Sequence, residues 1–384
     1  MINFETPYLP DDVNYNAGRL KVLNDHLLEM IGGNELQAAN YCLSRDGKVF
    51  ANTAMGRFSY REEEKRLMQP DTIQSIASIT KLFTAVSIFK LVEDGKMRLD
   101  QTVGEFIDEF KEPPFNKINV AHLLSHTSGL APDENCFENK YFVSPWAFIE
   151  NMKDVSWIRA SMSCGMRKNP GEEWAYCSYG YIILGEIISR VSGTFANDYI
   201  FENIVKPCEM YDTCFKLSPE QAKRHNARSE RMEKQMNSII AGEKLDHGIW
   251  DTIPGTGGGL HSTALDLCKF GTMLLNKGTY NGKRIIGRKA VEKMTAIYVT
   301  PDIRDYCWGA GGVYHQYGLG PDARHNLTSF YTKGSFFHEG AGACSLVIDP
   351  VEKLVAAWFV PFVNDIWTAR AINNVSAIIW SGLE

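Results

Sequence analysis

The chain has 384 residues, of which 44% are hydrophobic and 22% are charged, a composition typical of a globular protein with a sizeable core. Its formal net charge of -6 leaves no excess of lysine and arginine to neutralise a phosphate backbone, so nucleic acid is not expected as a partner. The first residues lack the basic start and apolar run of a secretory signal, and no apolar stretch is long enough to span a bilayer. Together with nine scattered cysteines, these features predict a cytoplasmic protein with reduced thiols.

The N-terminal part predicts a helix followed by a hairpin. Leucine and isoleucine recur at helical spacing from about residue 15 to residue 31, and Gly32 can end this helix. Two strand-like runs, 39–44 and 48–52, then flank an Asp-Gly pair at 46–47, which suits the positive φ angles of a tight turn. We therefore expect two antiparallel strands after the first helix.

A second helix is predicted over residues 80–93. It has so few polar positions that we expect it to be buried on most sides, and Gly95 can take the left-handed conformation that often follows a helix. The region from about 100 to 250 shows helical periods and few strand-like runs, and residues 224–244 are its most polar part. This pattern favours a helical region with an exposed segment near its end.

Strand character returns at residues 344–348 and 354–359, and a last helix is predicted from about 365 to 380. Helix, strands, helical region, strands and helix in this order favour an α+β fold. Its antiparallel sheet would join the N- and C-terminal parts of the chain across a helical insertion.

Ser78 and Lys81 form a Ser-x-x-Lys pattern near the start of the second predicted helix. On a helix this spacing puts both side chains on one face, roughly 5–6 Å apart at Cβ. Serine is a weak nucleophile at neutral pH, and Lys81 can accept its proton if burial or neighbouring positive charge lowers the lysine pKa. The N–H groups at the start of the helix can also stabilise an oxyanion.

The same pattern occurs a second time, at Ser87 and Lys90. Nine residues amount to about two and a half helical turns, so Ser87 faces nearly opposite Ser78 and both cannot line one cleft. Ser87 lies in mid-helix, where its hydroxyl can bond a carbonyl of the preceding turn, whereas Ser78 lies where N–H donors are free. Ser78 is therefore favoured as the nucleophile, although so short a pattern alone is more often structural.

Five further segments follow the Ser-x-x-Lys pattern along nearly the whole chain. They are His122–Leu130, Pro170-Gly171 with Tyr176-Cys177-Ser178, Lys206–Met210, Gly257–Thr263 and His338-Glu339-Gly340. With these segments in this order, the chain resembles the family of class C β-lactamases, penicillin-binding proteins of the DD-peptidase type and their esterase relatives. The resemblance implies a β-lactamase/transpeptidase-like α+β fold, with an antiparallel sheet flanked by helices plus an inserted all-helical domain. The expected domains are a discontinuous sheet domain, residues 1–85 and 255–384, and a mainly helical domain, residues 86–254, with the active site at their interface.

Tyr176-Cys177-Ser178 resembles the second motif of this family, whose tyrosine shares the acid–base work with the lysine. An adjacent ammonium group is expected to favour a phenolate and to lower the pKa of Tyr176. Taken alone, a tyrosine in this apolar context is more often a packing residue. The family usually has asparagine at the third position, so Ser178, a candidate substrate-binding residue, is shorter and has only one donor.

The His-Glu-Gly segment at 338–340 resembles the third motif, on the strand that edges the active site. β-Lactamases and DD-peptidases usually begin this motif with lysine, whereas His338 is mostly neutral near pH 7, which favours neutral esters as substrates. Gly340 is expected to let a substrate approach the strand closely. The resemblance implies that the N–H groups of Ser78 and Ala341 form the oxyanion hole.

Two other patterns are interpreted as structural. His122 and His126 are four residues apart and could share a metal ion, but no third ligand or general-base carboxylate stands at a suitable spacing, so no metal is expected. The glycine run at 257–259 lacks the lysine and hydroxyl residue of a phosphate-binding loop, so we expect a closely packed turn.

The sequence thus predicts a serine hydrolase that works through an acyl-enzyme, with Ser78, Lys81 and Tyr176 as its catalytic residues and no cofactor. The expected substrate is a small-molecule ester or amide, and a carboxylesterase of small esters is the favoured function. β-Lactam hydrolysis, D-peptide cleavage and acyl transfer to an alcohol remain open, as does a relative that binds or senses without turnover. The joint presence of the three residues favours catalysis.

Overall fold

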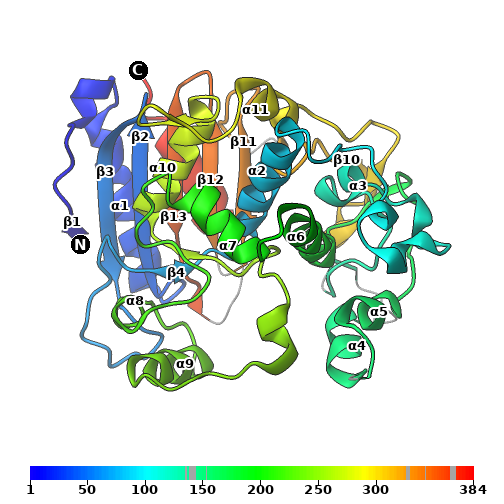
Figure 1. Ribbon diagram of the computed structural model, residues 1–384. Coiled ribbons are helices and arrows are strands. Elements are labelled where there is room, and N and C mark those ends of the chain that lie inside the picture. Colours follow the sequence, from blue (N-terminus) through cyan, green and yellow to red (C-terminus); the bar gives the residue numbers. More distant parts are fainter. Residues whose placement is uncertain (135, 138–143, 153, 326–328, 342, 364–368) are drawn as a thin grey trace.

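The computed structural model describes residues 1–384 except 135, 138–143, 153, 326–328, 342 and 364–368. At its centre lies a six-stranded antiparallel sheet in which strands from both ends of the chain are neighbours (Figure 1). The α+β fold predicted from the sequence is confirmed. Across the sheet the strands are β1 (Ile2–Asn3), β3 (Lys48–Gly56), β2 (Ala38–Arg45), β13 (Leu354–Phe359), β12 (Cys344–Asp349) and β11 (Phe336–Gly340).

Two short turns connect neighbouring strands of the sheet as the sequence predicts. Asp46 and Gly47, between β2 and β3, have φ angles of 52° and 77°, the positive values that a two-residue hairpin turn needs. The turn from β12 to β13 is held by Asp349, whose Oδ1 accepts the N–H groups of Val351 and Glu352 at 3.1 Å each. Side-chain bonds of this kind stabilise turns because they replace missing backbone partners.

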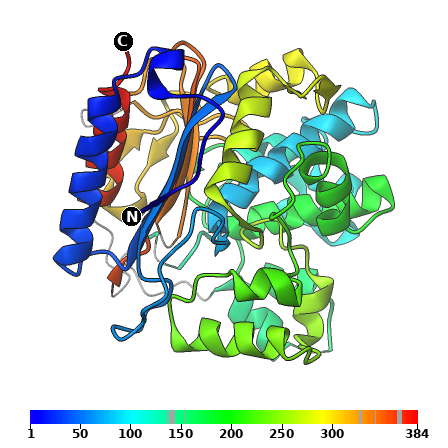
Figure 2. The same cartoon turned by 90° about the vertical axis from the view of Figure 1, so that its left-hand side faces the viewer.

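One face of the sheet is covered by the two ends of the chain. Leu43, Val347 and Ala356 point to this face and pack in one hydrophobic core with helices α1 (Ala17–Gly32) and α12 (Val375–Trp380). Figure 2 shows these two helices next to each other on that face. A π-helical turn, Arg370–Asn374, leads into α12, while residues 364–368 of the expected last helix lie outside the described residues.

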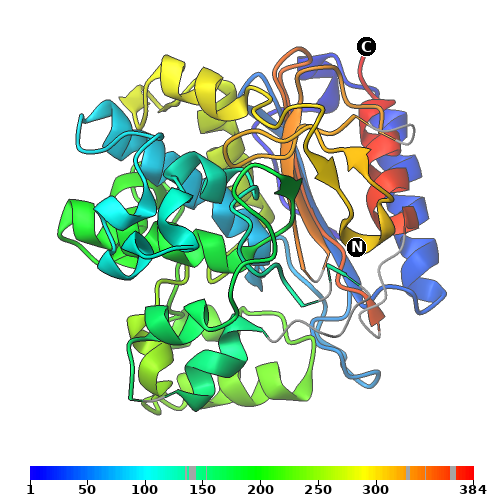
Figure 3. The ribbon, with the colours of Figure 1, turned by 90° about the vertical axis from the view of Figure 1, so that its right-hand side faces the viewer.

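The opposite face of the sheet packs against α10 (Ala264–Leu275). Leu346 and Val355 alternate with the residues of the first face and join a second, larger core. Gly271 lets α10 lie close to the sheet, because a Cβ there would come within 2.4 Å of a Val355 methyl carbon. Figure 3 shows α1 and α12 on one side of the sheet and most of the other helices on the far side.

Helix α2 (Thr80–Glu93) lies in this second core and carries the first predicted motif. Eleven of its fourteen residues are buried, as expected from its apolar sequence, and Gly95 follows with a φ of 70°. It packs against α6 (Ser178–Ser192), α7 (Ala196–Ile200) and α11 (Arg288–Thr295). The side chains at its N-terminal end are thereby fixed from several directions.

Helices dominate residues 100–250 as predicted, and α9 there is largely exposed, with Met236 as its one buried residue. The further helices of this region are α3 (Val120–Leu124), α4 (Pro145–Asn151), α5 (Trp157–Met162), α8 (Pro219–Lys223) and α9 (Glu230–Ile240), with 3-10 turns at Val103–Glu105, Asp108–Lys111, Phe115–Lys117 and Gly248–Thr252. The short strands of the chain are β4 (Gln74–Ser75), β5 (Glu173–Trp174), β6 (His261–Ser262), β7 (Thr279–Tyr280), β8 (Lys283–Arg284), β9 (Arg304–Asp305) and β10 (Val313–Tyr314).

The division of the chain into two domains stays a prediction. Its expected boundary at residue 85 falls inside the continuous helix α2, so this helix would belong to both parts. Within the described residues, none of the helices is long and apolar enough to cross a bilayer.

Candidate active site

The chain enters helix α2 through a strained turn that presents Ser78. Ala77 has a φ of 42°, a left-handed value that costs a residue with a Cβ about 1–3 kcal/mol. On one side of this turn, β4 pairs with β6; on the other, a single 3-10 turn, Ala77–Ile79, continues into the helix. Because both sides are fixed, the Ser78 hydroxyl is held at the edge of a cavity.

Lys81 lies one helical turn further and is completely buried. Its Nζ donates hydrogen bonds to Ser78 Oγ at 3.1 Å, to Ser178 Oγ at 3.0 Å and to the Gly257 carbonyl at 2.6 Å. Burial lowers the Lys81 pKa to about 8, although the negative charge of Asp133 acts in the opposite direction. Lys81 can accept the Ser78 proton only if its pKa is lowered, and burial meets this condition. A substantial fraction of the lysine side chains is then neutral at mildly alkaline pH.

Tyr176 lies two residues before α6, and its phenol is close enough to the Ser78 side chain for that group to oppose a rise of the tyrosine pKa. The Lys81 Nζ lies 4.8 Å from the centre of the tyrosine ring. Burial, reinforced by the negative charge of Asp133, raises the pKa of Tyr176 well above 10. The expected phenolate was therefore wrong: the desolvation of an anion outweighs the attraction of the ammonium group, and the tyrosine is neutral.

Asp133 is a site residue that the sequence did not reveal. Its two carboxylate oxygens accept the Ser178 N–H and the Ser178 Oγ–H, each at 2.7 Å. Lys81, Ser178 and Asp133 therefore form a hydrogen-bonded chain. Asp133 stands 45 residues before Ser178 in an ordinary loop, so no local pattern connects the two.

Ser178 is placed differently from the expectation for a substrate-binding residue. Its only proton is donated to Asp133 and its oxygen accepts from Lys81, so no donor is left for a substrate. Ser178 is also not among the residues that line the cavity. Instead, Ser178 connects Lys81 to Asp133 through hydrogen bonds.

His126 fixes the backbone of the second motif. Its Nδ1 accepts the Cys177 N–H at 3.0 Å, and its ring centre lies 4.4 Å from that of Tyr176. Burial, together with the charge of Lys81, keeps the His126 pKa well below 6.5, so the ring is neutral and can accept this bond. His122 has another task, since its Nδ1 accepts the Asn119 N–H at the start of α3. The described residues contain no group of three or more metal-ligating side chains.

His338 lies buried on β11, in contact with the cavity. Its Nδ1 is 2.7 Å from the Glu339 carbonyl, and its Nε2 is 3.4 Å from the Tyr317 hydroxyl. Burial and then the charge of Lys81 lower the His338 pKa to about 4. The third motif therefore presents a neutral ring at pH 7, as the sequence predicts.

Gly340 ends β11 directly beside the segment that carries the nucleophile. A Cβ at this position would lie 2.3 Å from the Ile76 carbonyl oxygen and 2.5 Å from Cys344 Sγ, so the glycine is required by packing of the strand. The sequence predicts that Gly340 lets a substrate approach, whereas in the structure the space of its missing side chain is filled by Ile76 and Cys344. Next to it, the Ala341 N–H has no acceptor among the described residues.

A cavity of about 840 Å³ opens beside the Ser78 hydroxyl. Of the predicted site residues, Lys81 and Ser178 do not line the cavity, and Lys81 contacts it through Ser78 and the Tyr176 ring. Ser78, Tyr176, His338, Gly340 and Ala341 contact the cavity, together with aromatic side chains that include Trp174, Trp308 and Tyr317. The arrangement combines a hydroxyl, an amine with a lowered pKa and a backbone N–H without an acceptor among the described residues, next to this cavity.

The comparison of sequences agrees with this geometry, since residues 25–369 match the model of the family named Beta-lactamase. The chain belongs to the beta-lactamase family. Protein flp of Staphylococcus aureus (strain MW2) is 30% identical over 224 residues, which are 56% of this chain and 42% of that protein. The chain thus spans less than half the length of this relative.

Two solved structures show the same fold. A penicillin-binding protein homologue from Caulobacter crescentus has a TM-score of 0.73 at 19% identity, and the alignment covers 100% of both chains. A family VIII carboxylesterase has a TM-score of 0.72 at 18% identity, with 99% of this chain and 100% of that chain covered. The β-lactamase/transpeptidase fold that the resemblance implied is confirmed.

Proposed function

We propose that this member of the beta-lactamase family is a serine hydrolase of small carboxylic esters. The observation that supports it most directly is the position of Ser78 Oγ, which accepts a hydrogen bond from Lys81 Nζ at 3.1 Å and lies with Tyr176 at the edge of a cavity. A nucleophile needs such a base within hydrogen-bonding distance.

Acylation would begin from neutral Lys81. As Ser78 Oγ attacks the ester carbonyl carbon, its proton passes to Lys81 Nζ, and the carbonyl oxygen becomes an oxyanion held by the N–H groups of Ser78 and Ala341. When the C–O bond breaks, neutral Tyr176 donates its proton to the leaving alkoxide and regains one from the Lys81 ammonium. Water then attacks the acyl-enzyme by the same route, which releases the acid and restores Ser78.

In this scheme, Asp133 acts electrostatically on Lys81. Its charge stabilises the Lys81 ammonium that forms during attack, through Ser178, and thereby opposes the effect of burial. The two influences together set the Lys81 pKa near 8, where the amine accepts a proton without being fully protonated beforehand. Protein groups perform every proton transfer, so the scheme needs no cofactor.

The neutral state of His338 supports esters over carboxylate-bearing β-lactams and D-peptides at the third motif. A substrate carboxylate beside His338 would gain little binding free energy, because the ring carries no permanent positive charge. The similarity to a family VIII carboxylesterase points in the same direction.

Three substrates tested in parallel decide between the open functions: p-nitrophenyl hexanoate, nitrocefin and a D-alanyl dipeptide. The proposal expects turnover of the ester at the highest kcat/KM and loss of that turnover in Ser78→Ala. Addition of ethanol would reveal acyl transfer as ethyl hexanoate. A stable acyl adduct without product would show a binding or sensing protein, and equal ester turnover by both proteins would remove Ser78 from the reaction.

A further inference from the structure

Several charged side chains around the cavity are satisfied by neighbouring protein groups. Asp322 accepts hydrogen bonds from Arg324 Nε at 2.8 Å and from His315 Nε2 at 3.1 Å. Asp133 is bonded to Ser178, as described above. These groups satisfy each other and leave little charge to attract a ligand.

Arg228 differs from Arg324, the other arginine that lines the cavity. It lines the cavity and is partly exposed, yet among the residues that the structure describes it has neither an ion pair nor a hydrogen bond. Arginine carries its charge at every physiological pH, and its planar guanidinium group matches a carboxylate in a two-point hydrogen bond. Glu339 also lines the cavity, but among the described residues it forms no ion pair with Arg228, and burial raises the pKa of its carboxyl group. A positive charge at the cavity that has no ion pair is available to a ligand.

Arg228 lies towards the oxyanion end of β11. Its charge acts on the Cys344 thiol, whose pKa burial raises to about 12, and Cys344 is the strand partner of Gly340. The paired Arg324 belongs to the other end, because Asp322 is bonded to the backbone of Phe337. The cavity thus holds one arginine that is paired with Asp322, and a second, Arg228, that acts on Cys344 and has no ion pair among the described residues.

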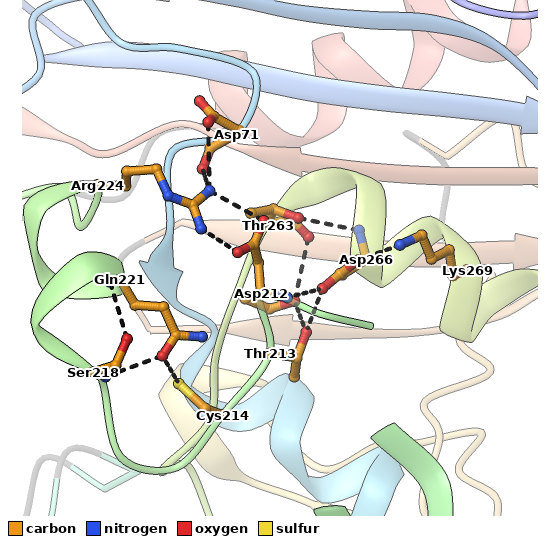
Figure 4. A network of polar contacts seen from close by, with 11 residues as sticks. Asp71, Asp212, Thr213, Cys214, Ser218, Gln221, Arg224, Thr263, Asp266 and Lys269 are labelled. Atoms are coloured by element: carbon orange, nitrogen blue, oxygen red, sulfur yellow. Dashed lines mark hydrogen bonds and ion pairs between the residues drawn. The ribbon is translucent and has the colours of Figure 1, made fainter. Parts of the chain in front are cut away.

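The chain that leads to Arg228 is held rigidly by neighbouring segments. Ile73 exchanges backbone hydrogen bonds with Arg224 and Asn226, at 2.9 Å each, and the Ala227 carbonyl accepts the Tyr60 N–H at 2.8 Å. Figure 4 shows how Arg224 is fixed in turn by ion pairs to two aspartates, Asp71 and Asp212. A guanidinium group on such a fixed segment loses less freedom when it binds a ligand.

We propose that Arg228 binds a carboxylate of the substrate, so that the preferred substrates are small esters that carry a negative charge. The inference rests on the proposed function and narrows its substrate class. It agrees with the neutral His338, because the substrate charge would be bound by Arg228 and not by His338. A half-ester of a short dicarboxylic acid has the required chemistry.

A matched pair of esters tests this proposal: p-nitrophenyl hexanoate and mono-p-nitrophenyl adipate have six-carbon acyl chains that differ in a terminal carboxylate. We expect the wild type to prefer the adipate, and Arg228→Gln to lower kcat/KM for it by about 10- to 100-fold while hexanoate changes less than about twofold. Arg228→Lys keeps the charge without the planar fork and should retain part of the preference. Arg231→Gln, an exposed arginine on α9, is the matched control and should leave both rates unchanged.

A second pair places the carboxylate on the leaving group: phenyl hexanoate and p-carboxyphenyl hexanoate. An effect of Arg228→Gln on this pair alone would place the substrate charge on the alcohol part, and an effect on the adipate pair would place it on the acyl part. Added salt should weaken the wild-type preference in whichever pair shows it. Equal ratios for wild type and Arg228→Gln in both pairs would overturn the proposal.

Binding to Ser78→Ala separates this proposal from the proposed function, because it needs no turnover. We expect calorimetry to show tighter binding of mono-p-nitrophenyl adipate than of the hexanoate, and loss of the difference when Arg228→Gln is added. If this difference is present but no ester is turned over by the wild type, the anion site stands and the esterase proposal fails. If esters are hydrolysed through Ser78 but neither assay distinguishes the two acyl chains, the anion site fails and the esterase proposal stands.

Discussion

The Ser-x-x-Lys pattern occurs once at the turn that enters helix α2 and once inside this helix, and the two copies have different surroundings. Ser78 follows the strained Ala77, contacts the cavity and is bonded by Lys81. Ser87 is buried in mid-helix and donates to the Phe83 carbonyl at 3.0 Å. Lys90 reaches away to the Ile285 carbonyl at 3.2 Å. The pattern alone therefore places a serine and a lysine on one face of a helix. Whether they can act as nucleophile and base depends on the residues that surround them.

The surroundings of the first copy come from distant parts of the chain. Lys81 is held by Ser178 and Gly257, and its pKa is set by burial against the charge of Asp133. In the part of the chain that the structure describes, Ser87 of the second copy bonds only the Phe83 carbonyl of its own helix. Substitutions at both copies should therefore have very unequal effects.

Loss of the nucleophile should give the largest effect. We expect Ser78→Ala to lower kcat/KM for p-nitrophenyl hexanoate by about 10⁴-fold or more, because the acyl-enzyme can no longer form. Ser87→Ala should keep activity within about twofold of the wild type, since its hydroxyl bonds only its own helix. Steady-state kinetics on folded protein measures both, and similar losses in the two variants would contradict the distinction.

Removal of the Lys81 amine should give the second largest loss of activity. Lys81→Met keeps an apolar side chain of similar length in a buried place but removes the base, so kcat should fall by about 10²- to 10⁴-fold. Lys90→Met is the control and should leave kcat almost unchanged. A wild-type rate in Lys81→Met would mean that another group accepts the Ser78 proton.

Closer packing beside the first copy should have an intermediate effect. Gly340→Ala forces a methyl group against the Ile76 carbonyl, so we expect a loss of about 1–3 kcal/mol in the free energy of unfolding and a roughly tenfold lower kcat/KM. Gly32→Ala, at the end of α1, meets open space and is the control. Chemical denaturation and ester kinetics test both variants, and an unchanged Gly340→Ala would show that β11 does not need this close approach.

The smallest effect should be a change of pH dependence. Because only neutral Lys81 accepts the proton, kcat/KM should rise with pH up to about 8 and then level off. The negative charge of Asp133 raises the Lys81 pKa, so Asp133→Asn should move this rise to lower pH and increase the share of plateau activity at pH 7 by about two- to fivefold. The neighbouring Glu134→Gln should leave the profile in place, and a shift to higher pH in Asp133→Asn would contradict the electrostatic account.

The elements of the fold could be predicted because their signals are local. The apolar pattern of α2, the Asp-Gly turn at 46–47 and the paired strands near the C-terminus all appear where the sequence placed them. The neutral His338 also followed from its residue type, and burial only lowers its pKa further.

The features that sequence analysis missed or misjudged depend on tertiary contacts. The protonation of Tyr176 was misjudged because a pKa follows burial as well as neighbouring charge. Asp133 and Arg228 lie in loops whose sequences have no signal for the cavity that they adjoin. Gly340 is required because it packs against Ile76, which lies 264 residues earlier in the chain. Only the folded structure, in which β11 lies beside the turn that carries Ser78, reveals this contact.

Covalent labelling with a fluorophosphonate tests the central claim most directly, because the reagent forms a stable bond with an activated serine. We predict one adduct per chain by intact mass, located on Ser78 by peptide mapping, absent in Ser78→Ala and formed far more slowly in Lys81→Met. Labelling of Ser87 or another residue instead, or equally fast labelling of Ser78 without Lys81, would contradict the account.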